Sequence, residues 1–380
     1  MSEFETFLNQ KPIYYDKFDL ARIKKAYELL KPLINLKYVI HLIGTNGKGS
    51  TGRFLATYLH NLGFKVGHYT SPHVLKFNER IWIHGADIDD NHLNTLFEKL
   101  NSLLPKDIIE ALSYFEYTTL LSFLAFDNFD FCIIEAGLGG EFDATNVLTK
   151  DISILTNIGY DHQAFLGDTL KSITTTKLKS VNKKLIVSNQ TYSEVLDIVD
   201  DFCKTDNIEK IEIDFSREFK EKILNFCKQN LLSSYLALNL ETALKVVKCL
   251  NLEIDLKYVN GFKIRGRFEK IAKNIIVDVG HNELSAIMIK QELNDKKINL
   301  IYNSLDDKDY KKIISILKDN IKELLIIPID SARAVKLDKL FEELHEYNPK
   351  LFIDIKDDEE YLVFGSFVVV ETFLRWFEKE

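Results

Sequence analysis

The chain of 380 residues is poor in cysteine and carries no excess of positive charge. Its four cysteines form no Cys-x-x-Cys pair, so their spacing signals neither a zinc site nor a disulfide framework. A formal net charge of −8 argues against nucleic-acid and membrane-surface partners, which usually meet a basic field. No apolar run approaches the roughly 20 residues of a membrane span, and residues 1–11 lack the apolar core of a secretory signal. We therefore expect a cytoplasmic enzyme.

Hydrophobic residues make up 46% of the chain and charged residues 28%, a balance typical of globular proteins with sizeable cores. The length exceeds one ordinary core, so we expect two domains. Amphipathic helices alternate with short apolar runs that lack alternation, which predicts a doubly wound α/β sheet. The expected strands are Phe64–Tyr69, Phe129–Glu135, Ile152–Ile158 and Leu185–Ser188, and the expected helices are Leu20–Leu30, Asp89–Leu104, Tyr114–Phe126 and Gln229–Leu250.

The strand pattern restarts after Asn260 and Gly261, which follow the long expected helix. We therefore place a domain boundary there and assign residues 1–259 to the first domain and 260–380 to a second, smaller α/β domain. The strands expected in the second domain are Ile275–Val279, Asn299–Tyr302, Leu324–Ile329 and Leu362–Val370.

The stretch His41–Ser50 follows an apolar strand and precedes an amphipathic helix. In this layout, backbone N–H groups and a helix N-terminus face one anion, glycines let the backbone approach phosphate oxygens, and Lys48 supplies a point charge. The strict phosphate-loop pattern is not met, because Leu42 stands where a glycine is expected and Gly49 follows the lysine. A glycine turn after a strand is the alternative interpretation.

Three polar side chains lie where expected parallel strands end, at the edge that binds ligands in doubly wound sheets. Glu135 would be costly to bury without a cation, and magnesium held by one or two protein groups plus phosphates is a natural partner. His162 could complete such a site, and Ser71 could add a hydroxyl ligand. The alternatives are a Glu135 that caps the following turn, a structural histidine and a turn-starting serine.

In the second domain, Asp278 and His281 end the first expected strand, and Arg267 lies just upstream. Together they could clamp a nucleotide. The alternative is a surface arginine and a helix cap at Asn282. Lys308 lies within an acidic run, so we expect its charge to be solvated.

In their order along the chain, these blocks resemble the bifunctional dihydrofolate synthase/folylpolyglutamate synthase family of the Mur-type ligases. The matching blocks are Gly44–Ser50, Thr70–His73, Tyr114–Thr119, Glu135–Gly140, Asp143–Val147, Asn157–His162, Leu166–Thr169, Gly266–Phe268, Asp278–Asn282, Asp307–Asp309 and Gly365–Ser366. The resemblance implies an N-terminal, P-loop-type, doubly wound ATPase domain and a smaller C-terminal Rossmann-like α/β domain.

The resemblance also implies roles for single residues. The residues implied to bind ATP are Gly44, Thr45, Asn46, Gly47, Lys48, Gly49, Ser50, Asn230, Arg267, Asp278 and His281. Those implied to bind magnesium are Ser71, Glu135, His162 and Lys177, and those implied to act in catalysis are Lys48, His162 and Lys177. The blocks around the pterin substrate contain Tyr114, Phe115, Phe142 and Asp143.

The chain departs from the family pattern near the aligned Lys177, which in the family is carbamylated and joins a second metal. The usual Ile-Ala-x-Glu-Lys-Ala-Gly-Ile reads Ile173–Ser180 here, with changed flanks. Glu141 stands where the family usually has Arg, which implies that any substrate-carboxylate contact there is lost. Gly280 and Glu283 replace the usual Ala and Pro.

The implied activity is that of an ATP-dependent carbon–nitrogen ligase of folate biosynthesis and one-carbon metabolism. It would add L-glutamate to dihydropteroate, to a reduced folate or to both, through an acyl phosphate, with one or two Mg²⁺ ions. We expect a monomer. The alternatives are a Mur-type ligase for another carboxylate, a nucleotide-hydrolysing switch, and a branch that retains only one of the two folate activities.

Overall fold

The computed structural model describes residues 3–13 and 19–379, and the chain divides into two compact units. Unit 1 comprises Met1–Ile158, Ala164–Ser216 and Leu238–Phe262, and unit 2 comprises Gly159–Gln163, Arg217–Ala237 and Lys263–Glu380. The chain therefore enters unit 2 twice before its final passage into it. The assignment of 1–259 and 260–380 to two functional domains stays a prediction, because this interleaved division concerns compactness and not function.

Unit 1 is built on an eight-stranded sheet of order β4-β3-β2-β5-β1-β6-β7-β8. Its strands are β1 (Val39–Ile43), β2 (Val66–Tyr69), β3 (Ile81–Ile83), β4 (Ala86–Asp87), β5 (Phe131–Glu135), β6 (Ile152–Leu155), β7 (Lys184–Val187) and β8 (Glu209–Ile211). The strands from β2 to β8 in this order are parallel, and only β3 and β4 run antiparallel to their neighbours. The central strands are buried along their whole length, as expected where helices cover both faces.

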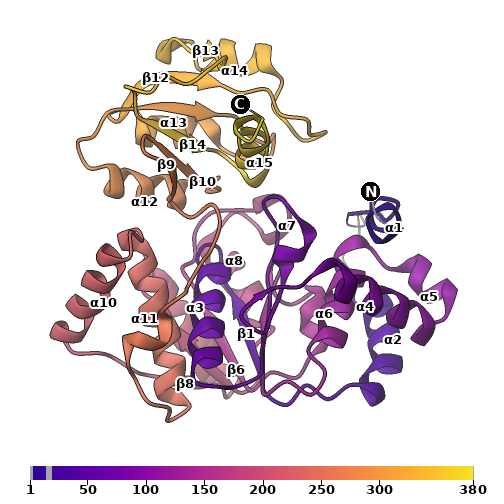
Figure 1. The fold of residues 1–380 in the computed structure, drawn as a ribbon. Helices are drawn as coiled ribbons and strands as arrows, with labels where there is room; N and C mark the ends of the chain where they lie inside the picture. Colours follow the sequence, from indigo (N-terminus) through magenta and orange to yellow (C-terminus); the bar gives the residue numbers. More distant parts are fainter. Residues whose placement is uncertain (1–2, 14–18, 380) are drawn as a thin grey trace. The chain divides into compact units, whose positions relative to one another are not determined.

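Helices flank this sheet in unit 1, with α3 beside β1 and the group α2, α4, α5 and α6 gathered together (Figure 1). The helices are α1 (Glu3–Asn9), α2 (Ala21–Leu30), α3 (Lys48–Asn61), α4 (Asp90–Leu103), α5 (Lys106–Ala111), α6 (Tyr114–Ala125), α7 (Gln163–Leu166), α8 (Leu170–Leu178), α9 (Glu194–Thr205) and most of α11 (Ser234–Cys249). Asp89 caps α4 by accepting a hydrogen bond from the His92 amide, and α6 is buried almost all round. The predicted doubly wound architecture is confirmed.

Unit 2 carries a six-stranded sheet of order β13-β12-β11-β14-β10-β9. Its strands are β9 (Glu269–Ala272), β10 (Ile275–Asp278), β11 (Ile298–Tyr302), β12 (Ile321–Ile326), β13 (Lys350–Leu351) and β14 (Tyr361–Phe364), and its helices are α10 (Arg217–Gln229), α12 (Glu283–Leu293), α13 (Tyr310–Leu317), α14 (Leu337–Glu343) and α15 (Phe367–Phe377). Only β9 pairs antiparallel. Asn282 caps α12 through the Ser285 amide, as one sequence-based alternative expected.

Two predicted elements differ from the structure in their bounds. The helix expected over Gln229–Leu250 is present as α11 (Ser234–Cys249) but begins later, because α10 ends at Gln229 and the chain turns at Leu231 (φ 57°). The strand expected over Leu362–Val370 ends at Phe364. Gly365 there has φ 133°, and the Ser366 hydroxyl accepts a hydrogen bond from the Val369 amide, which starts α15.

The register of the unit 1 sheet gathers polar groups at one edge. Leu42 of β1 lies opposite Glu135 of β5, and Ile43 lies opposite Leu155 of β6. Because the three strands are parallel, the glycine loop after β1 and the side chain of Glu135 lie at the same carboxyl end of the sheet.

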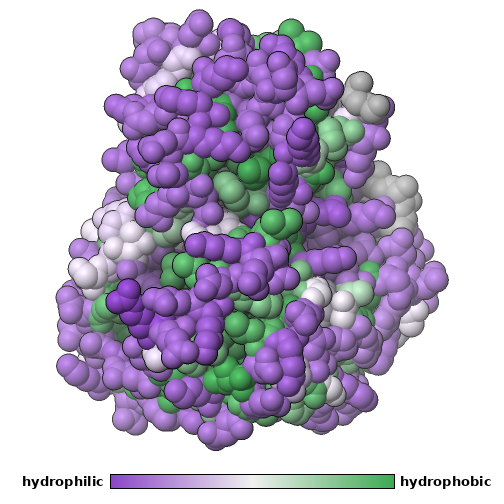
Figure 2. All heavy atoms as spheres, turned by 60° about the vertical axis from the view of Figure 1, so that its left-hand side comes forward, coloured by the Kyte–Doolittle hydropathy of each residue, from purple (hydrophilic) through white to green (hydrophobic). Residues whose placement is uncertain are grey.

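The surface drawn in Figure 2 is dominated by polar side chains, and apolar ones form separate patches. Among the residues that the structure describes, no helix is long and apolar enough to cross a bilayer.

Candidate functional site

The glycine loop joins β1 to α3 in a conformation that only glycine allows at two positions. Gly44 has φ 147° and Gly47 has φ 91°. A Cβ at Gly44 would lie 1.9 Å from the hydroxyl oxygen of Thr156. The amides of Thr45 and Asn46 both donate to the backbone carbonyl of Asn157, at 3.0 and 3.1 Å. These bonds hold the loop to the residues that follow β6. Helix α3 begins directly after the loop, and the N–H groups of its first turn have no partner within the helix.

The Lys48 ammonium lies over this loop. Its Nζ donates to the backbone carbonyls of Gly44 and Thr45, each at 3.2 Å, and lies 3.9 Å from Oε1 of Glu135. The side chains of Lys48 and Glu135 are 14% and 6% exposed. One cation and one carboxylate therefore face each other at low solvent exposure beside a helix N-terminus, an arrangement suited to phosphate groups and a divalent cation.

Glu135 ends β5 and is held by groups that follow β2. Its Oε2 accepts hydrogen bonds from the Thr70 hydroxyl and from the Ser71 amide, the latter at 3.2 Å. A Cβ at Gly49 would lie 2.9 Å from the Thr70 hydroxyl oxygen and 3.2 Å from Glu135 Oε2, so this glycine lets both approach the first turn of α3. Ser71 and Glu135, both predicted metal ligands, are thus brought together.

The oxygen donors at this edge suit a magnesium ion that phosphates and water also bind, and they do not form a metal site made of protein groups alone. Within residues 3–13 and 19–379, no three His, Cys, Asp or Glu side chains are grouped to hold a metal ion. Magnesium is usually bound through one or two carboxylates together with phosphates and water, and the pair of Glu135 with the neighbouring Ser71 matches that donor set.

Lys177 of α8 also reaches the glycine loop. Its side chain is buried, and its Nζ donates to the Gly44 carbonyl at 2.9 Å. A Cβ at Gly140 would lie 2.5 Å from the Lys177 carbonyl oxygen, so the loop after β5 packs directly on this turn of α8. The predicted catalytic lysine is therefore next to the predicted phosphate loop.

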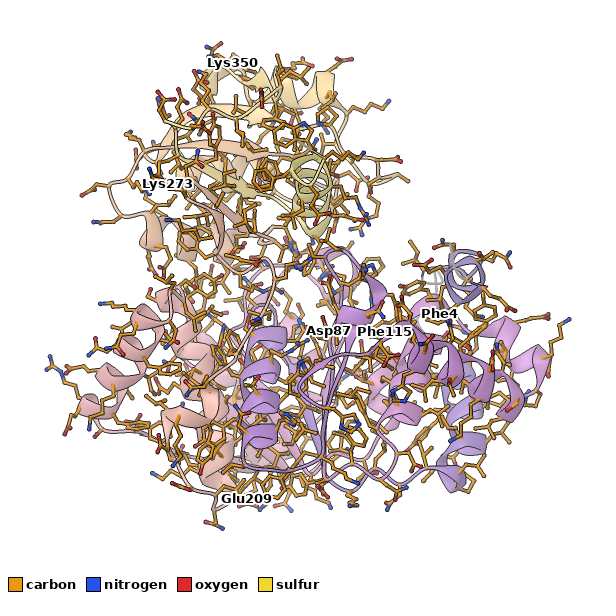
Figure 3. The ribbon with its side chains drawn as sticks, viewed as in Figure 1. Phe4, Asp87, Phe115, Glu209, Lys273 and Lys350 are labelled. Atoms are coloured by element: carbon orange, nitrogen blue, oxygen red, sulfur yellow. The ribbon has the colours of Figure 1, made fainter. Side chains whose placement is uncertain are left out.

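Two of the predicted substrate residues, Tyr114 and Phe115, begin α6. The Phe115 ring (labelled in Figure 3) fills the space in front of Gly137, where a Cβ would meet it at 2.5 Å, and it stacks at 6.1 Å on Tyr69. The Tyr114 ring lies 5.2 Å from the guanidinium of Arg80, a cation–π contact.

The other two substrate residues behave differently from each other. Phe142 is 51% exposed and available to a ligand. Asp143 is buried, and its carboxylate accepts hydrogen bonds from the amides of Leu138 and Thr145 and from the Thr145 hydroxyl, at 2.5 to 2.9 Å. Burial raises the pKa of Asp143 although these bonds act to lower it. Its carboxylate stabilises its own loop.

The Glu141 substitution has a counterpart in α8. Glu141 Oε2 lies 2.8 Å from Nζ of Lys179, which stands at the glycine position of the family block, and the Glu141 amide donates to the Thr176 carbonyl at 2.9 Å. The anion that replaces the family arginine is therefore neutralised by a new cation.

In unit 2, Asp278 organises the turn that carries Arg267. The buried carboxylate accepts hydrogen bonds from the amides of Phe268 (2.8 Å) and Gly280 (2.7 Å) and from the Tyr235 hydroxyl (2.7 Å). Phe268 has φ 49°, a conformation that these bonds hold in place. Burial raises the pKa of Asp278, with Arg267 and the three donors acting against it.

The guanidinium of Arg267 lies 5.2 Å from the Phe367 ring. Nδ1 of His281 lies 3.0 Å from the Val279 carbonyl, and Nε2 lies 3.5 Å from Asp161. His162, with φ 52°, has Nε2 3.9 Å from the same Asp161 carboxylate.

Lys308 differs from expectation, and the nucleotide contact expected of Asn230 stays a prediction. The side-chain Nδ2 of Asn230 donates to the Phe226 carbonyl at 2.9 Å, just after α10. A different asparagine, Asn239, meets the glycine loop in unit 1, with Oδ1 only 2.6 Å from where a Gly47 Cβ would lie. Sequence reasoning missed it because nothing local marks its position. Lys308, expected to be solvated, is buried against Asp161.

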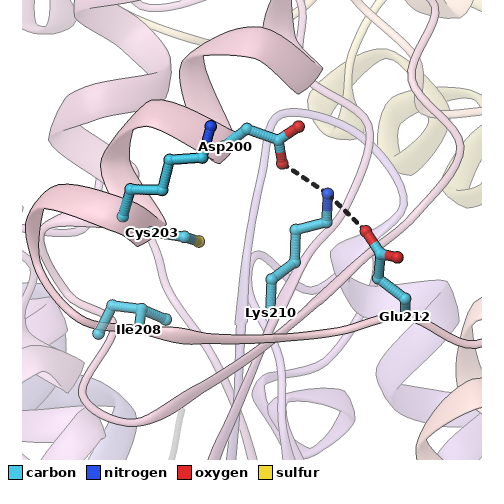
Figure 4. A pocket seen from close by; sticks show the side chains of 6 residues that line it. Asp200, Cys203, Ile208, Lys210 and Glu212 are labelled. Atoms are coloured by element: carbon cyan, nitrogen blue, oxygen red, sulfur yellow. Dashed lines mark hydrogen bonds and ion pairs between the residues drawn. The ribbon is translucent and has the colours of Figure 1, made fainter.

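A hollow of about 390 Å³ on unit 1 contains none of the predicted site residues (Figure 4). Lys210 in it bridges Asp200 and Glu212 at 2.5 and 3.0 Å, so its charge is already paired. The lining residues are Asp200, Cys203, Lys204, Ile208, Lys210 and Glu212.

The fold and the glycine-loop edge define an α/β protein with a P-loop-type, doubly wound N-terminal unit and a smaller Rossmann-like unit. No family model matches the chain. A dihydrofolate synthase/folylpolyglutamate synthase from Buchnera aphidicola subsp. Acyrthosiphon pisum is 32% identical over 97% of this chain and 95% of its own length. One from Haemophilus influenzae is 29% identical over 98% and 96%. The chain belongs to the dihydrofolate synthase/folylpolyglutamate synthase family.

Solved structures agree with this assignment. The Helicobacter pylori folylpolyglutamate synthetase has a TM-score of 0.78 and 36% identity, covering 99% of this chain and 98% of that one. A bifunctional folylpolyglutamate synthase/dihydrofolate synthase from Yersinia pestis, complexed with AMPPNP and Mn ion, has a TM-score of 0.83 at 24% identity over 99% and 97%, a likeness of fold.

Proposed function

We propose that the protein is an ATP-dependent carbon–nitrogen ligase that joins L-glutamate to dihydropteroate, to a reduced folate or to both. The observation that carries the proposal is the glycine loop with Lys48 and Glu135 at one sheet edge, in a chain of this family. Two solved structures of the same fold support this choice of substrates. An Escherichia coli protein holds DHPP and ADP, and a bifunctional folylpolyglutamate synthase/dihydrofolate synthase holds Mn, AMPPNP and L-glutamate.

The reaction needs activation, because a carboxylate is a poor acyl donor and amide formation in water is uphill. A carboxylate oxygen of the pterin substrate attacks the γ-phosphorus of ATP, and ADP leaves. The glutamate amine then attacks the acyl carbon, phosphate leaves, and the amine loses a proton. This sequence requires no protein nucleophile. The protein's task is to orient the reactants and to stabilise the transferring negative charge.

In unit 1, the glycine loop would hold the ATP phosphates through backbone N–H groups, and the Lys48 ammonium would face the transferring phosphoryl group. Ser71 and Glu135 would hold magnesium. By the family resemblance, His162 would also do so, and Lys177 would do so in its carbamylated form. Magnesium, when bound, offsets phosphate charge. Asn239 is our candidate for the asparagine of the nucleotide site, in preference to Asn230, because it lies beside Gly47.

In unit 2, Arg267 and His281 would contact the nucleotide. Asp278 would act through them, since its carboxylate already binds three donors. For the substrate, the exposed Phe142 and the rings of Tyr114 and Phe115 would contact the pterin, and Asp143 would hold the loop that presents Phe142.

The test is phosphate release from Mg-ATP with glutamate, comparing dihydropteroate, tetrahydrofolate and no pterin. We expect release to require both glutamate and a pterin carboxylate. Release that persists without either would reject the ligase and favour a nucleotide-hydrolysing switch. Release with a different carboxylate alone would favour another Mur-type ligase.

One observation favours a branch with a single folate activity. The family usually has an arginine at position 141, whereas this chain has Glu141 in an ion pair with Lys179. This position therefore offers no cation to a substrate carboxylate. The same substrate comparison decides this, because a one-activity enzyme would use only one of the two pterins. We further propose a cytoplasmic monomer without nucleic-acid partners, in keeping with the acidic net charge and the absence of a disulfide pattern.

A further inference from the structure

The residues Gly159–Gln163 follow a strand of unit 1 but belong to unit 2. We call them the 159–163 segment. Its first residue packs on α12: a Cβ at Gly159 would lie 3.2 Å from Cδ2 and 3.3 Å from Cβ of Leu284. The segment therefore lies close against the first turn of that helix, and it carries His162, a predicted functional residue.

A buried carboxylate in the middle of the segment, that of Asp161, has four polar partners. Oδ1 of Asp161 accepts hydrogen bonds from Nζ of Lys308 at 2.5 Å and from the His162 amide at 2.9 Å. Oδ2 accepts one from Nδ2 of Asn282 at 2.9 Å and lies 3.5 Å from Nε2 of His281. The donors come from three separate places in the chain.

The central ion pair is shielded from water. The side chains of Asp161 and Lys308 are 7% and 5% exposed. Lys308 also lies 3.1 Å from Asp307, whose second partner is Arg333 at 2.6 Å. A buried carboxylate is stable only where cations and donors surround it, and this one has both.

The network also orders the helix cap Asn282 and the proposed nucleotide contact His281. Asn282, which holds Asp161 through Nδ2, caps α12 through Oδ1 and the Ser285 amide. His281 has one ring nitrogen on the Val279 carbonyl and the other toward Asp161, which fixes the plane of the ring. Asp161 is thus the shared partner of the helix cap, the imidazole and the His162 backbone.

We propose that Asp161 and Lys308 are positioning residues, which fix the 159–163 segment to unit 2 and set the orientation of the His281 ring for the nucleotide. The inference rests on the proposed function for the role of His281, but the anchoring of the segment does not. Lys308 places its ammonium nitrogen 2.5 Å from Oδ1 of Asp161 at a site shielded from water. An exposed lysine would hold the carboxylate less firmly, because water would screen the ion pair.

The experiment compares Lys308→Met, Asp161→Asn and the double variant with an exposed pair of the same unit. Lys290 and Asp319 lie 2.9 Å apart with side chains 42% and 65% exposed, so Lys290→Met with Asp319→Asn is the matched control. Amide hydrogen exchange over 159–163 and the thermal midpoint of unfolding are measured on the full chain, together with KM for ATP and kcat in the phosphate-release assay.

We expect Lys308→Met to raise exchange over 159–163 at least about tenfold, since an unpaired buried charge favours local opening. We expect KM for ATP to rise by about tenfold, the lower range for losing a group that orients a ligand contact, with a smaller change in kcat. The double variant removes both charges, so we expect its thermal midpoint to recover while its exchange and KM stay raised. The surface pair should change exchange over 159–163, KM for ATP and kcat by much less than Lys308→Met does.

A double variant with wild-type exchange over 159–163 and wild-type KM would overturn the proposal, as would a surface control that behaves like Lys308→Met. If Lys308→Met does not fold, Asp161→Asn, which keeps the shape and the acceptor oxygen, gives the same comparison. A failure of the proposed function is distinguishable, because the wild type would then release no phosphate in response to glutamate and pterin. The exchange measurement and a titration with ADP would still decide whether the pair anchors the segment and orients His281.

Discussion

Nζ of Lys177 donates a hydrogen bond to the backbone carbonyl of Gly44 at 2.9 Å, so the buried end of α8 supports the glycine loop directly. The same carbonyl accepts from Lys48 at 3.2 Å. Two ammonium groups thus converge on one peptide of the loop, and the conformation of the loop depends on a helix more than a hundred residues away in sequence.

The first prediction concerns that contact. Replacing Lys177 by Met removes a buried donor and leaves the Gly44 carbonyl with fewer partners, which should disorder the loop. We expect kcat/KM for ATP to fall by at least about tenfold, the effect of roughly 1.4 kcal/mol. The measurement is steady-state phosphate release. Lys171→Met in the exposed face of the same helix is the control, and equal losses in both variants would contradict a specific role for Lys177.

The second prediction concerns the carboxylate at the end of β5. Glu135→Gln keeps the size of the side chain but removes the negative charge that would meet magnesium. We expect magnesium-dependent turnover to fall at least about tenfold, the lower end for losing a positioned metal partner. Phosphate release is followed as a function of magnesium concentration. The exposed Glu110→Gln is the control, and near-normal turnover in Glu135→Gln would remove Glu135 from the metal site.

The third prediction concerns Lys150, a buried lysine whose Nζ donates to Asn146 Oδ1 at 2.5 Å. Burial lowers the pKa of Lys150 from 10.5 to about 8, with the charge of Asp143 acting against this. Between those pH values the unfolded chain binds the proton that the folded chain has lost. The free energy of unfolding should therefore rise with pH from about 8 to about 10.5.

The measurement is denaturant unfolding of the wild type and Lys150→Met across this pH range. The difference in the free energy of unfolding between the two should change by up to about 3 kcal/mol, and most of the change should fall within that window. A difference that stays constant with pH would show that Lys150 keeps its proton in the fold.

The elements that sequence reasoning placed correctly are those whose signals are local. Asp89 and Asn282 each cap a helix through an amide three residues on, and the glycine loop lies between a strand and a helix, as its composition indicates. The strand predicted over Leu362–Val370 ends at Phe364. Its valines suit a strand, but the Ser366 cap starts α15, which buries Val369 and Val370 in unit 2.

Contacts between distant segments could not be read from the chain. Lys308 sits in an acidic run that looks solvated, and only the fold brings Asp161 to it across 147 positions. Asn239 meets Gly47 in the same way, and nothing near it in the sequence marks this contact. Propensity and spacing describe neighbours along the chain, and these pairs depend on tertiary packing.

The last prediction separates backbone strain from steric contact in the glycine loop. Gly47 and Gly63 have similar φ values, 91° and 95°, so alanine is strained at both. A Cβ at Gly47 would lie 2.6 Å from Oδ1 of Asn239, whereas at Gly63 nothing lies within 4 Å.

Both alanine variants should therefore lose about 1–2 kcal/mol of stability from the strained conformation. Only Gly47→Ala should displace Asn239 and weaken ATP binding, by at least about tenfold, since a clash at the loop shifts the N–H groups that would face phosphate. Denaturant unfolding gives the stability, and a titration with ADP gives the affinity. Equal ADP affinity in the two variants would mean that the contact of Gly47 with Asn239 does not shape the nucleotide site.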